Sequence, residues 1–203
     1  VLDGASNIKK LVKRVGALDM GAVAITDHGN MFGILEFYSE AKKAGIKPIL
    51  GCETYVARNS MDRMSGKEDR SGHHLILLAK NQEGYHNLAK MISIANLKGF
   101  FYTPRIDKDL LTKYHKGLIA SSACLGGEIP QLIMNKGEEE ALKSIDWYHN
   151  LFGDDYYLEL MDHGLPEQKQ VNEVLIRLAR ERGIKLIATN DVHYVNKEDF
   201  EAH

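Results

Sequence analysis

The chain has 203 residues, 44% of them hydrophobic and 27% charged, with a formal net charge of −2. These values are ordinary for a globular protein of one large domain or two small ones. The near-neutral charge excludes a global attraction to nucleic acid, so any such contact needs a local basic patch. Two cysteines exclude a disulfide framework, and no apolar run is long enough to cross a membrane, so a cytoplasmic protein is predicted.

Helical and strand-like patterns alternate along the chain. Helices are predicted at residues 6–17, 32–44, 83–97, 107–114, 138–151 and 167–182, and strands at 22–26, 49–56, 74–79, 118–123, 156–161 and 185–189. This alternation predicts βαβ units and a mostly parallel sheet. No strand precedes the first helix, as though an opening strand had been removed from a longer chain, and restoring it gives seven strands.

Two Asp and His pairs follow short apolar runs, where strands should end. Asp27 and His28 follow residues 22–25, and Asp191 and His193 follow residues 186–188. A lone pair would be better explained as a helix N-cap beside a hydrogen-bonded histidine. Two pairs in register with a β/α pattern favour a shared site, because the loops at strand ends converge on one face.

Candidate metal ligands lie near most of the predicted strand ends: Asp3, His28, Glu53, His74, Cys124, Asp191 and His193. They outnumber the ligands of one tetrahedral ion and predict two or three divalent cations bridged by carboxylates. The mixture of nitrogen, oxygen and sulfur favours Zn²⁺, with Mn²⁺ or Fe²⁺ as alternatives. Such clusters hydrolyse phosphoesters. Their spread over the strand ends favours a closed barrel over an open doubly wound sheet.

Each candidate also has a simpler explanation when it is taken alone. Cys124 would be a small packing residue, Glu53 a solvated charge and Asp3 a turn residue before Gly4. His74 falls at the start of its predicted strand rather than at the end. Either that strand begins later, or the long polar loop at 58–72 carries His74 into the site.

Four stretches closely resemble the PHP (polymerase and histidinol phosphatase) domain family, at residues 26–33, 45–53, 163–168 and 189–194. Gly-Asn-Met-Phe-Gly at 29–33, Phe-Tyr-Thr-Pro-Arg at 101–105 and His-Gly-Leu-Pro-Glu-Gln at 163–168 resemble its branch in bacterial replicative DNA polymerases. The resemblance covers residues 1–203. It implies an α/β fold, a distorted (β/α)7 barrel whose first strand, bearing His-x-His, lies upstream of this fragment.

The resemblance also implies roles for individual residues. It makes ligands of a three-metal cluster from Asp3, His28, Glu53, His74, Cys124, Asp191 and His193. It makes Asp27 a residue that orients a ligand. Catalysis would fall to Glu53, Asp191 and His193, and we expect Arg105 and His163 to contact the substrate. Two ligands of the His-x-His strand are absent, so the fragment alone is expected to be a weak or inactive nuclease.

Three functions agree with this resemblance. The domain could hydrolyse DNA as a 3′→5′ proofreading exonuclease, or be a structural platform for the polymerase, or act as a stand-alone phosphatase. The filled ligand positions favour the first over the second, and the polymerase-branch stretches disfavour the third. The implied partners are the primer 3′ end, the remainder of the polymerase chain, a separate proofreading exonuclease and the sliding clamp, with no membrane.

Two loops could touch DNA. The basic residues of the loop 58–72 are nearly cancelled by Asp62, Glu68 and Asp69, so a solvated loop is favoured over phosphate contacts. The aromatic run 100–102 could stack on an unpaired base. Core packing, or contact with the rest of the polymerase, explains that run equally well.

Overall fold

The computed structural model describes residues 4–202. Its strands are β1 (Ala22–Ile25), β2 (Lys47–Val56), β3 (His73–Ala79), β4 (Phe100–Phe101), β5 (Thr103–Ile106), β6 (Leu118–Ser121), β7 (Tyr156–Leu160) and β8 (Lys185–Ala188). Its α-helices are α1 (Ile8–Ala17), α2 (Ile34–Lys43), α3 (Gln82–Leu97), α4 (Lys108–Tyr114), α5 (Glu128–Asn135), α6 (Glu138–Phe152) and α7 (Pro166–Arg182). Short 3₁₀ turns are η1 (Lys67–Asp69), η2 (Gly153–Asp155) and η3 (Lys197–Ala202).

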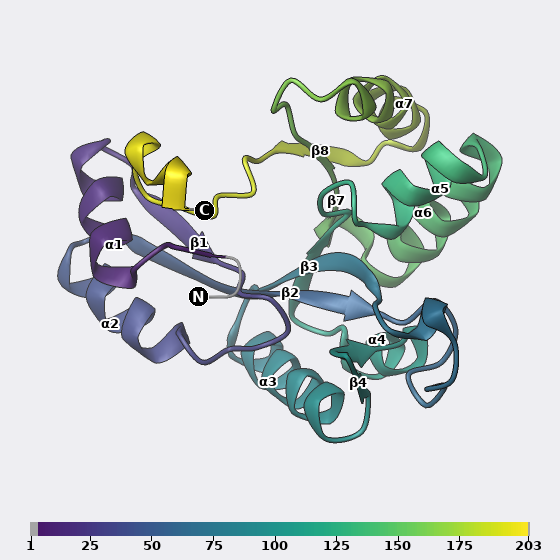
Figure 1. Cartoon of the computed structure of the whole chain (residues 1–203), viewed down its shortest axis with the longest axis horizontal. Helices are drawn as coiled ribbons and strands as arrows, with labels where there is room; N and C mark the ends of the chain where they lie inside the picture. Colours follow the sequence, from purple (N-terminus) through teal and green to yellow (C-terminus); the bar gives the residue numbers. More distant parts are fainter. Residues whose placement is uncertain (1–3, 203) are drawn as a thin grey trace.

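The strands form one curled sheet in the order β4-β5-β2-β3-β6-β7-β8, with β1 paired to the first half of β2. The helices cover the outside of the curl, and the C-terminal segment returns from β8 toward α1 (Figure 1). The α/β fold predicted from the alternation is therefore confirmed, as a curled half-barrel. Within residues 4–202, no helix is both long enough and apolar enough to cross a bilayer.

Two strands run against the others, β3 and the short edge strand β4, which pairs antiparallel with β5. β3 pairs antiparallel with both β2 and β6, whereas β1, β5, β7 and β8 make parallel pairs. The start of β3 therefore lies at the end of the sheet where the parallel strands finish. This reversal explains how His74 reaches the site from the start of its strand. The alternative that the strand begins after His74 is wrong, because β3 begins at His73.

The main core lies between the sheet and helices α3 to α7. It is built from side chains such as Leu77, Leu88, Ile106 and Leu158, all with no exposed surface. Two smaller clusters pack α1 and α2 against β1. Burying the apolar stripe of each helix against the sheet stabilises the curl, since apolar burial is the dominant favourable term in folding.

Local sequence signals explain most helix ends. Asn7 and Asp107 accept hydrogen bonds from the amides of Lys10 and Leu110 as N-caps of α1 and α4. With Asn7 as its cap, α1 begins at Ile8, two residues after the predicted start of the helix at residue 6. α7 begins at Pro166 and ends at Gly183, whose φ of 66° suits glycine.

The sequence missed two elements. The aromatic stretch predicted as a loop forms the β4–β5 hairpin, in which Phe101 pairs with Thr103. Helix α5, at Glu128–Asn135, was not predicted because Pro130 interrupts an already short apolar pattern. Pro130 is tolerated there because the first turn of a helix needs no donated amide hydrogen bond.

Candidate metal centre

Glu53 lies at the middle of the site because two strands bring their side chains to one face. In the β2–β3 ladder Tyr55 is opposite His74, and Glu53 is opposite Ile76. Residues two apart on a strand, and residues opposite each other, share a face. Glu53, Tyr55 and His74 therefore all point to the concave side of the sheet.

The Glu53 carboxylate is shared by two histidines. Its Oε1 lies 2.9 Å from Nδ1 of His28 and 2.9 Å from Nδ1 of His74. Its side chain is only 4% exposed. Burial alone would raise the pKa of Glu53, but hydrogen bonds from His28 and His74 together with their charge lower it to about 2. Glu53 is thus a buried anion, not the solvated charge that it would be in isolation.

His28 reaches Glu53 from the loop after β1. Residues His28 and Glu53 form an isolated parallel bridge, and the amide of Gly29 donates to the Glu53 carbonyl at 2.9 Å. Gly29 has a φ of 63°, and a Cβ there would lie 2.5 Å from Cγ of Pro104. Glycine is therefore required both by the backbone conformation and by the space.

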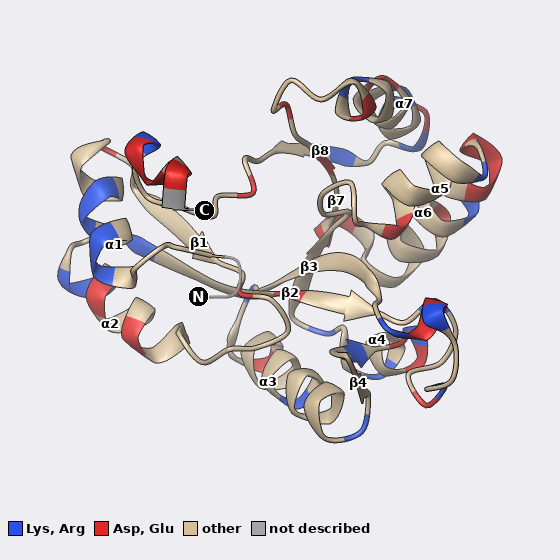
Figure 2. Ribbon diagram, viewed as in Figure 1, with Lys and Arg blue, Asp and Glu red and all other residues tan. Residues whose placement is uncertain are grey.

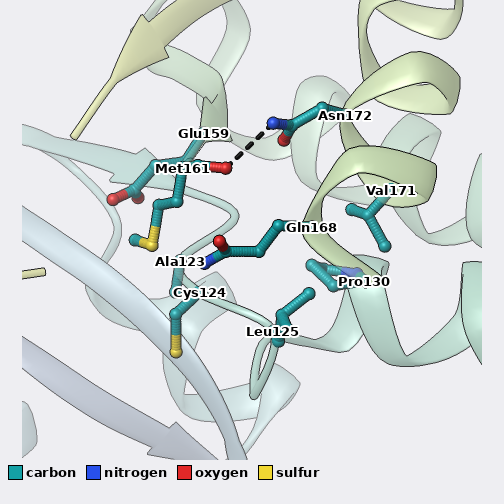
Figure 3. Close-up of a pocket in the computed structure, with 9 residues that line it drawn as sticks. All are labelled: Ala123, Cys124, Leu125, Pro130, Glu159, Met161, Gln168, Val171 and Asn172. Carbon is teal, nitrogen blue, oxygen red and sulfur yellow. Dashed lines mark hydrogen bonds between the residues drawn. The ribbon is translucent and has the colours of Figure 1, made fainter. Parts of the chain in front are cut away.

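Cys124 completes a cluster with Glu53 and His74. The ligand atoms of these three residues lie within 4.8 Å of one another, and the Cys124 Sγ is 3.4 Å from Nδ1 of His74. Its hydrogen bonds with Cys124 and with the accepting Glu53 carboxylate raise the pKa of His74 to about 10. Figure 3 shows the sulfur pointing away from the side chains that α7 contributes to the neighbouring pocket. Cys124 thus faces the site rather than the helices, as a ligand should.

The loop after β6 is shaped around His74. Ala123 has a positive φ of 61°, and the amide of His74 donates to the Gly126 carbonyl at 3.0 Å. A Cβ at Gly126 would lie 2.9 Å from Nδ1 of His74. The close approach of backbone to imidazole therefore depends on glycine at this position.

Asp191 and His193 form the far side of the site. Asp191 adopts a left-handed φ of 47°, and Nδ1 of His193 donates to the Asp191 carbonyl at 2.7 Å. The rings of His193 and His28 are 5.7 Å apart between centroids. The amide of Ala5 donates to the His193 carbonyl at 2.6 Å. His193 thus joins the cluster through His28, and the Asp191 carboxylate, about one-third exposed at 32%, lies at its edge.

His163 supports this far side through its hydrogen bonds, and its contact with a substrate stays a prediction. Its amide donates to Oε1 of Gln168 at 2.7 Å, and that bond fixes the orientation of the Gln168 amide. Nε2 of Gln168 then donates to Nδ1 of His163 at 3.0 Å, so the imidazole proton must be on Nε2. That proton is donated to the Asn190 carbonyl at 2.9 Å. His163 therefore anchors the residue before Asp191.

Three other expectations have different outcomes. Arg105 has no exposed surface and donates to the carbonyls of Gly99, Arg63 and Met61, so the expectation of substrate contact there is wrong. Burial raises the pKa of Asp27, and the charge of His28 opposes that rise. The role of Asp27 in orienting a ligand stays a prediction. Asp3 lies outside the described residues.

Two residues at the site were missed. Tyr55 has its ring centroid 5.4 Å from that of His74 and 6.3 Å from that of His28, and its spacing of two from Glu53 could have revealed it. Glu159 is buried in β7 and accepts hydrogen bonds from the hydroxyls of Ser121 and Thr189. It lines a small pocket with Cys124 (Figure 3). A charge inside an apolar strand was the signal for Glu159.

Comparison with known proteins decides the family. The model of the PHP domain matches residues 1–163. The chain belongs to the PHP domain family. It is 52% identical over 202 residues to the DNA polymerase III subunit alpha of Borreliella burgdorferi and 48% identical over 207 residues to that of Thermus aquaticus. These alignments cover 98% and 100% of the chain but only 17% of each relative. The resemblance predicted from the motifs is confirmed.

Solved structures agree with this fold. A protein of Bifidobacterium adolescentis described as a metal-dependent phosphoesterase superposes with a TM-score of 0.63 at 17% identity, covering 94% of this chain and 84% of that one. An amidohydrolase of Chromobacterium violaceum superposes with a TM-score of 0.56 at 15% identity, covering 97% of this chain and 85% of that one. At such identities the likeness concerns the fold of the PHP domain alone.

Proposed function

We propose that this PHP domain is a metal-dependent phosphodiesterase within a replicative DNA polymerase, acting as a 3′→5′ exonuclease on a mispaired primer end. The observation that carries the proposal is the buried Glu53 carboxylate, held between two histidines with Cys124 beside them. A buried anion contacting several neutral or cationic nitrogen donors is typical of a cation site and unusual in a packing core. The polymerase relatives supply the DNA substrate by analogy.

The residues fit a divalent cation. His28, Glu53, His74 and Cys124 offer nitrogen, oxygen and sulfur atoms, a mixture that suits Zn²⁺ better than Mg²⁺, with Mn²⁺ or Fe²⁺ as alternatives. Asp191 and His193, with Asp3, would supply ligands for a second or third cation. When bound, such cations lower the pKa of water to generate hydroxide and neutralise charge on a phosphodiester.

The chain itself would contribute position and charge. Glu53 would bridge ligand sites, because its Oε1 is already within 2.9 Å of both imidazoles. Tyr55 closes one wall of the site, since its ring packs beside His28 and His74. Asp191, at the exposed edge, is the group best placed to meet an incoming substrate. Asp191 and His193 would thus control entry, while Glu53 and His74 hold the centre.

A structural metal site is the second candidate. His28, Glu53, His74 and Cys124 number four, and structural zinc sites in proteins are closed by four protein ligands. In that case the domain would stabilise the polymerase and serve as a platform for other replicase subunits, such as a proofreading exonuclease or the sliding clamp. Either function would be carried out in the cytoplasm together with the rest of the polymerase chain.

The test is a 3′-mismatched primer assay on the full-length protein and its Asp191→Asn variant, with a melting curve of each. Loss of 3′→5′ hydrolysis with polymerisation largely intact supports the exonuclease. Parallel loss of melting temperature and polymerisation supports the structural site, because bound metal contributes folding free energy. Equal exonuclease rates, after a contaminating nuclease is excluded, would rule out hydrolysis at this centre.

A further inference from the structure

The turn between β4 and β5 carries an aromatic ring that the core does not use. Phe101 pairs directly with Thr103, so Tyr102 alone makes the turn. Tyr102 has a positive φ of 66°, and its side chain remains 62% exposed. A bulky residue in this conformation is strained. Such strain concentrates at ligand-binding positions, and here no burial of the ring compensates for it.

The ring is held in place by its neighbours. The Arg70 guanidinium lies over it, with Cζ 4.8 Å from the centroid, and Phe101 meets it edge to face at 5.0 Å. Phe101 in turn lies 5.7 Å from Cζ of the buried Arg105. The Thr103 hydroxyl donates to the Arg70 carbonyl at 3.4 Å. Contacts with Phe101 and Thr103 thus hold the exposed side chains of Tyr102 and Arg70 in place.

Arg70 differs from Arg63, in the same loop 58–72, in its ion pairing. Acidic and basic residues are intermixed there (Figure 2), and Arg63 forms ion pairs with both Glu68 and Asp69. Across residues 4–202 no carboxylate forms an ion pair with Arg70, which is exposed. The sequence suggested that this loop is electrically neutral. Pairing inside the loop instead leaves the cation over Tyr102 uncompensated.

The hairpin that carries Tyr102 forms part of the rim of the metal centre through its later residues. Pro104, two residues after Tyr102, is so close to Gly29 that a Cβ there would clash at 2.5 Å, and Gly29 follows the candidate ligand His28. β5 also pairs with β2, with Arg105 opposite Tyr55. A strand of DNA whose end reaches the centre would pass this rim.

We propose that Tyr102 and Arg70 form a subsite for single-stranded DNA, in which a base stacks on Tyr102 and the following phosphate pairs with Arg70. An exposed aromatic ring beside an unpaired cation is the combination that single-strand binders use, because every base has a stacking face and every nucleotide a phosphate. The subsite rests on the proposed function only for its choice of DNA as the ligand.

The test measures the fluorescence anisotropy of a labelled 12-nucleotide oligo(dT) with the whole 203-residue chain. EDTA is present, so binding is observed without hydrolysis. Tyr102→Gly removes the ring and relieves the positive φ, so the variant should fold at least as well. It should bind at least about fivefold more weakly, whereas Tyr102→Phe keeps the ring and the affinity. Arg70→Gln should weaken binding and reduce the salt dependence by about one phosphate contact.

Matched controls are Tyr38→Ala, an exposed tyrosine on α2, and Arg14→Gln, an exposed arginine on α1. Neither should change the affinity. Absence of binding by the unmodified chain, or equal affinity in Tyr102→Gly, overturns the subsite and leaves the hairpin as a contact for another part of a protein. Ring-dependent binding without any hydrolysis by the full-length protein would retain the subsite and refute the exonuclease.

Discussion

Glu53 and His74 lie on neighbouring strands of a hydrogen-bonded ladder, whereas Asp191 and His193 lie on a loop that follows an exposed strand. All four residues of β8 are exposed, and the hydrogen bonds that hold the loop after it include single ones from Ala5 and His163 and two from Thr189. In a ladder, pairing register fixes where side chains point. The ladder side of the centre should therefore be costly to disturb, and the loop side should be adjustable.

The first prediction compares the same substitution, carboxylate to amide, on the ladder side and on the loop side of the centre. Glu53→Gln removes a buried anion from between two histidines and should lower the unfolding free energy by about 3 kcal/mol. Asp191→Asn alters an edge residue and should cost less than about 1 kcal/mol. Urea unfolding in EDTA measures both without any metal contribution. Equal losses would show that the two sides are held alike.

The second prediction concerns the close approach around His74. Gly126→Ala places a methyl group 2.9 Å from Nδ1 of His74 and should cost about 2 kcal/mol, because a packed site must shift to accept it. Gly21→Ala is the control, since no atom lies within 4 Å of a Cβ there. Melting curves of the two variants should differ by several degrees. An unchanged melting temperature in Gly126→Ala would mean that the loop carrying Cys124 is not tightly packed against His74.

The third prediction concerns pH and the base of the Cys124 loop. Glu128 begins α5 and accepts hydrogen bonds from Lys108 at 2.8 Å, Ser144 at 2.7 Å and Tyr148 at 2.8 Å. Burial would raise the pKa of Glu128, but the charge of Lys108 and these hydrogen bonds lower it below its ordinary 4.5. A carboxylate with a lowered pKa stabilises the fold above its ordinary pKa, and this stabilisation disappears as the pH falls through the folded value.

Lys108→Met should therefore cost about 1 kcal/mol at pH 7, a modest value because Lys108 is partly exposed. It should also make stability fall less steeply as the pH drops below 4.5, the ordinary pKa of this carboxyl. Unfolding free energies at a series of pH values test both parts. A steeper acid-induced loss in the variant would contradict this account of Glu128.

The smallest effect on stability is expected on the loop side. Gln168→Leu removes the group that fixes the His163 tautomer, so the bond to Asn190 should weaken while the fold loses less than about 1 kcal/mol. Hydrogen exchange of residues 189–194 should accelerate. Asn172→Leu, on the same helix, is the control, because Asn172 donates to the Met161 carbonyl instead. Unchanged hydrogen exchange of residues 189–194 in Gln168→Leu would mean that other contacts hold this loop in place.

The candidate ligands whose positions the sequence could indicate are those whose signal is local. His28 stands where an apolar run ends, so its place at a strand end could be read directly. Glu53 lies inside β2, three residues before the strand ends at Val56. His74 could not be placed, because the reversal of β3 depends on pairing with β2 and β6 and leaves no local mark. Arg105 was misassigned for a similar reason, since only the folded loop shows the three carbonyls that bind its guanidinium.

Contacts between residues distant in sequence, and strand pairing, explain the other misses. Glu159 looks like an ordinary strand charge until Ser121 and Thr189, distant in sequence, donate to it. For Tyr102 the sequence favoured neither core packing nor base stacking. The β4–β5 pairing shows that it is the turn residue. Local pattern therefore predicted the elements and most of the candidate ligands, and long-range pairing decided their orientation and surroundings.

The buried Arg105 has a consequence for how this domain can vary. Its guanidinium binds the carbonyls of Met61 and Arg63, which fixes the first part of the long β2–β3 connection. Beyond Arg63 the connection mostly stabilises itself, with Asp69 accepting from the amides of Ser65 and Gly66. Lengthening a loop costs little entropy. Insertions near residues 64–68 can thus reshape the entrance to the centre during evolution while Glu53 and His74 stay in register.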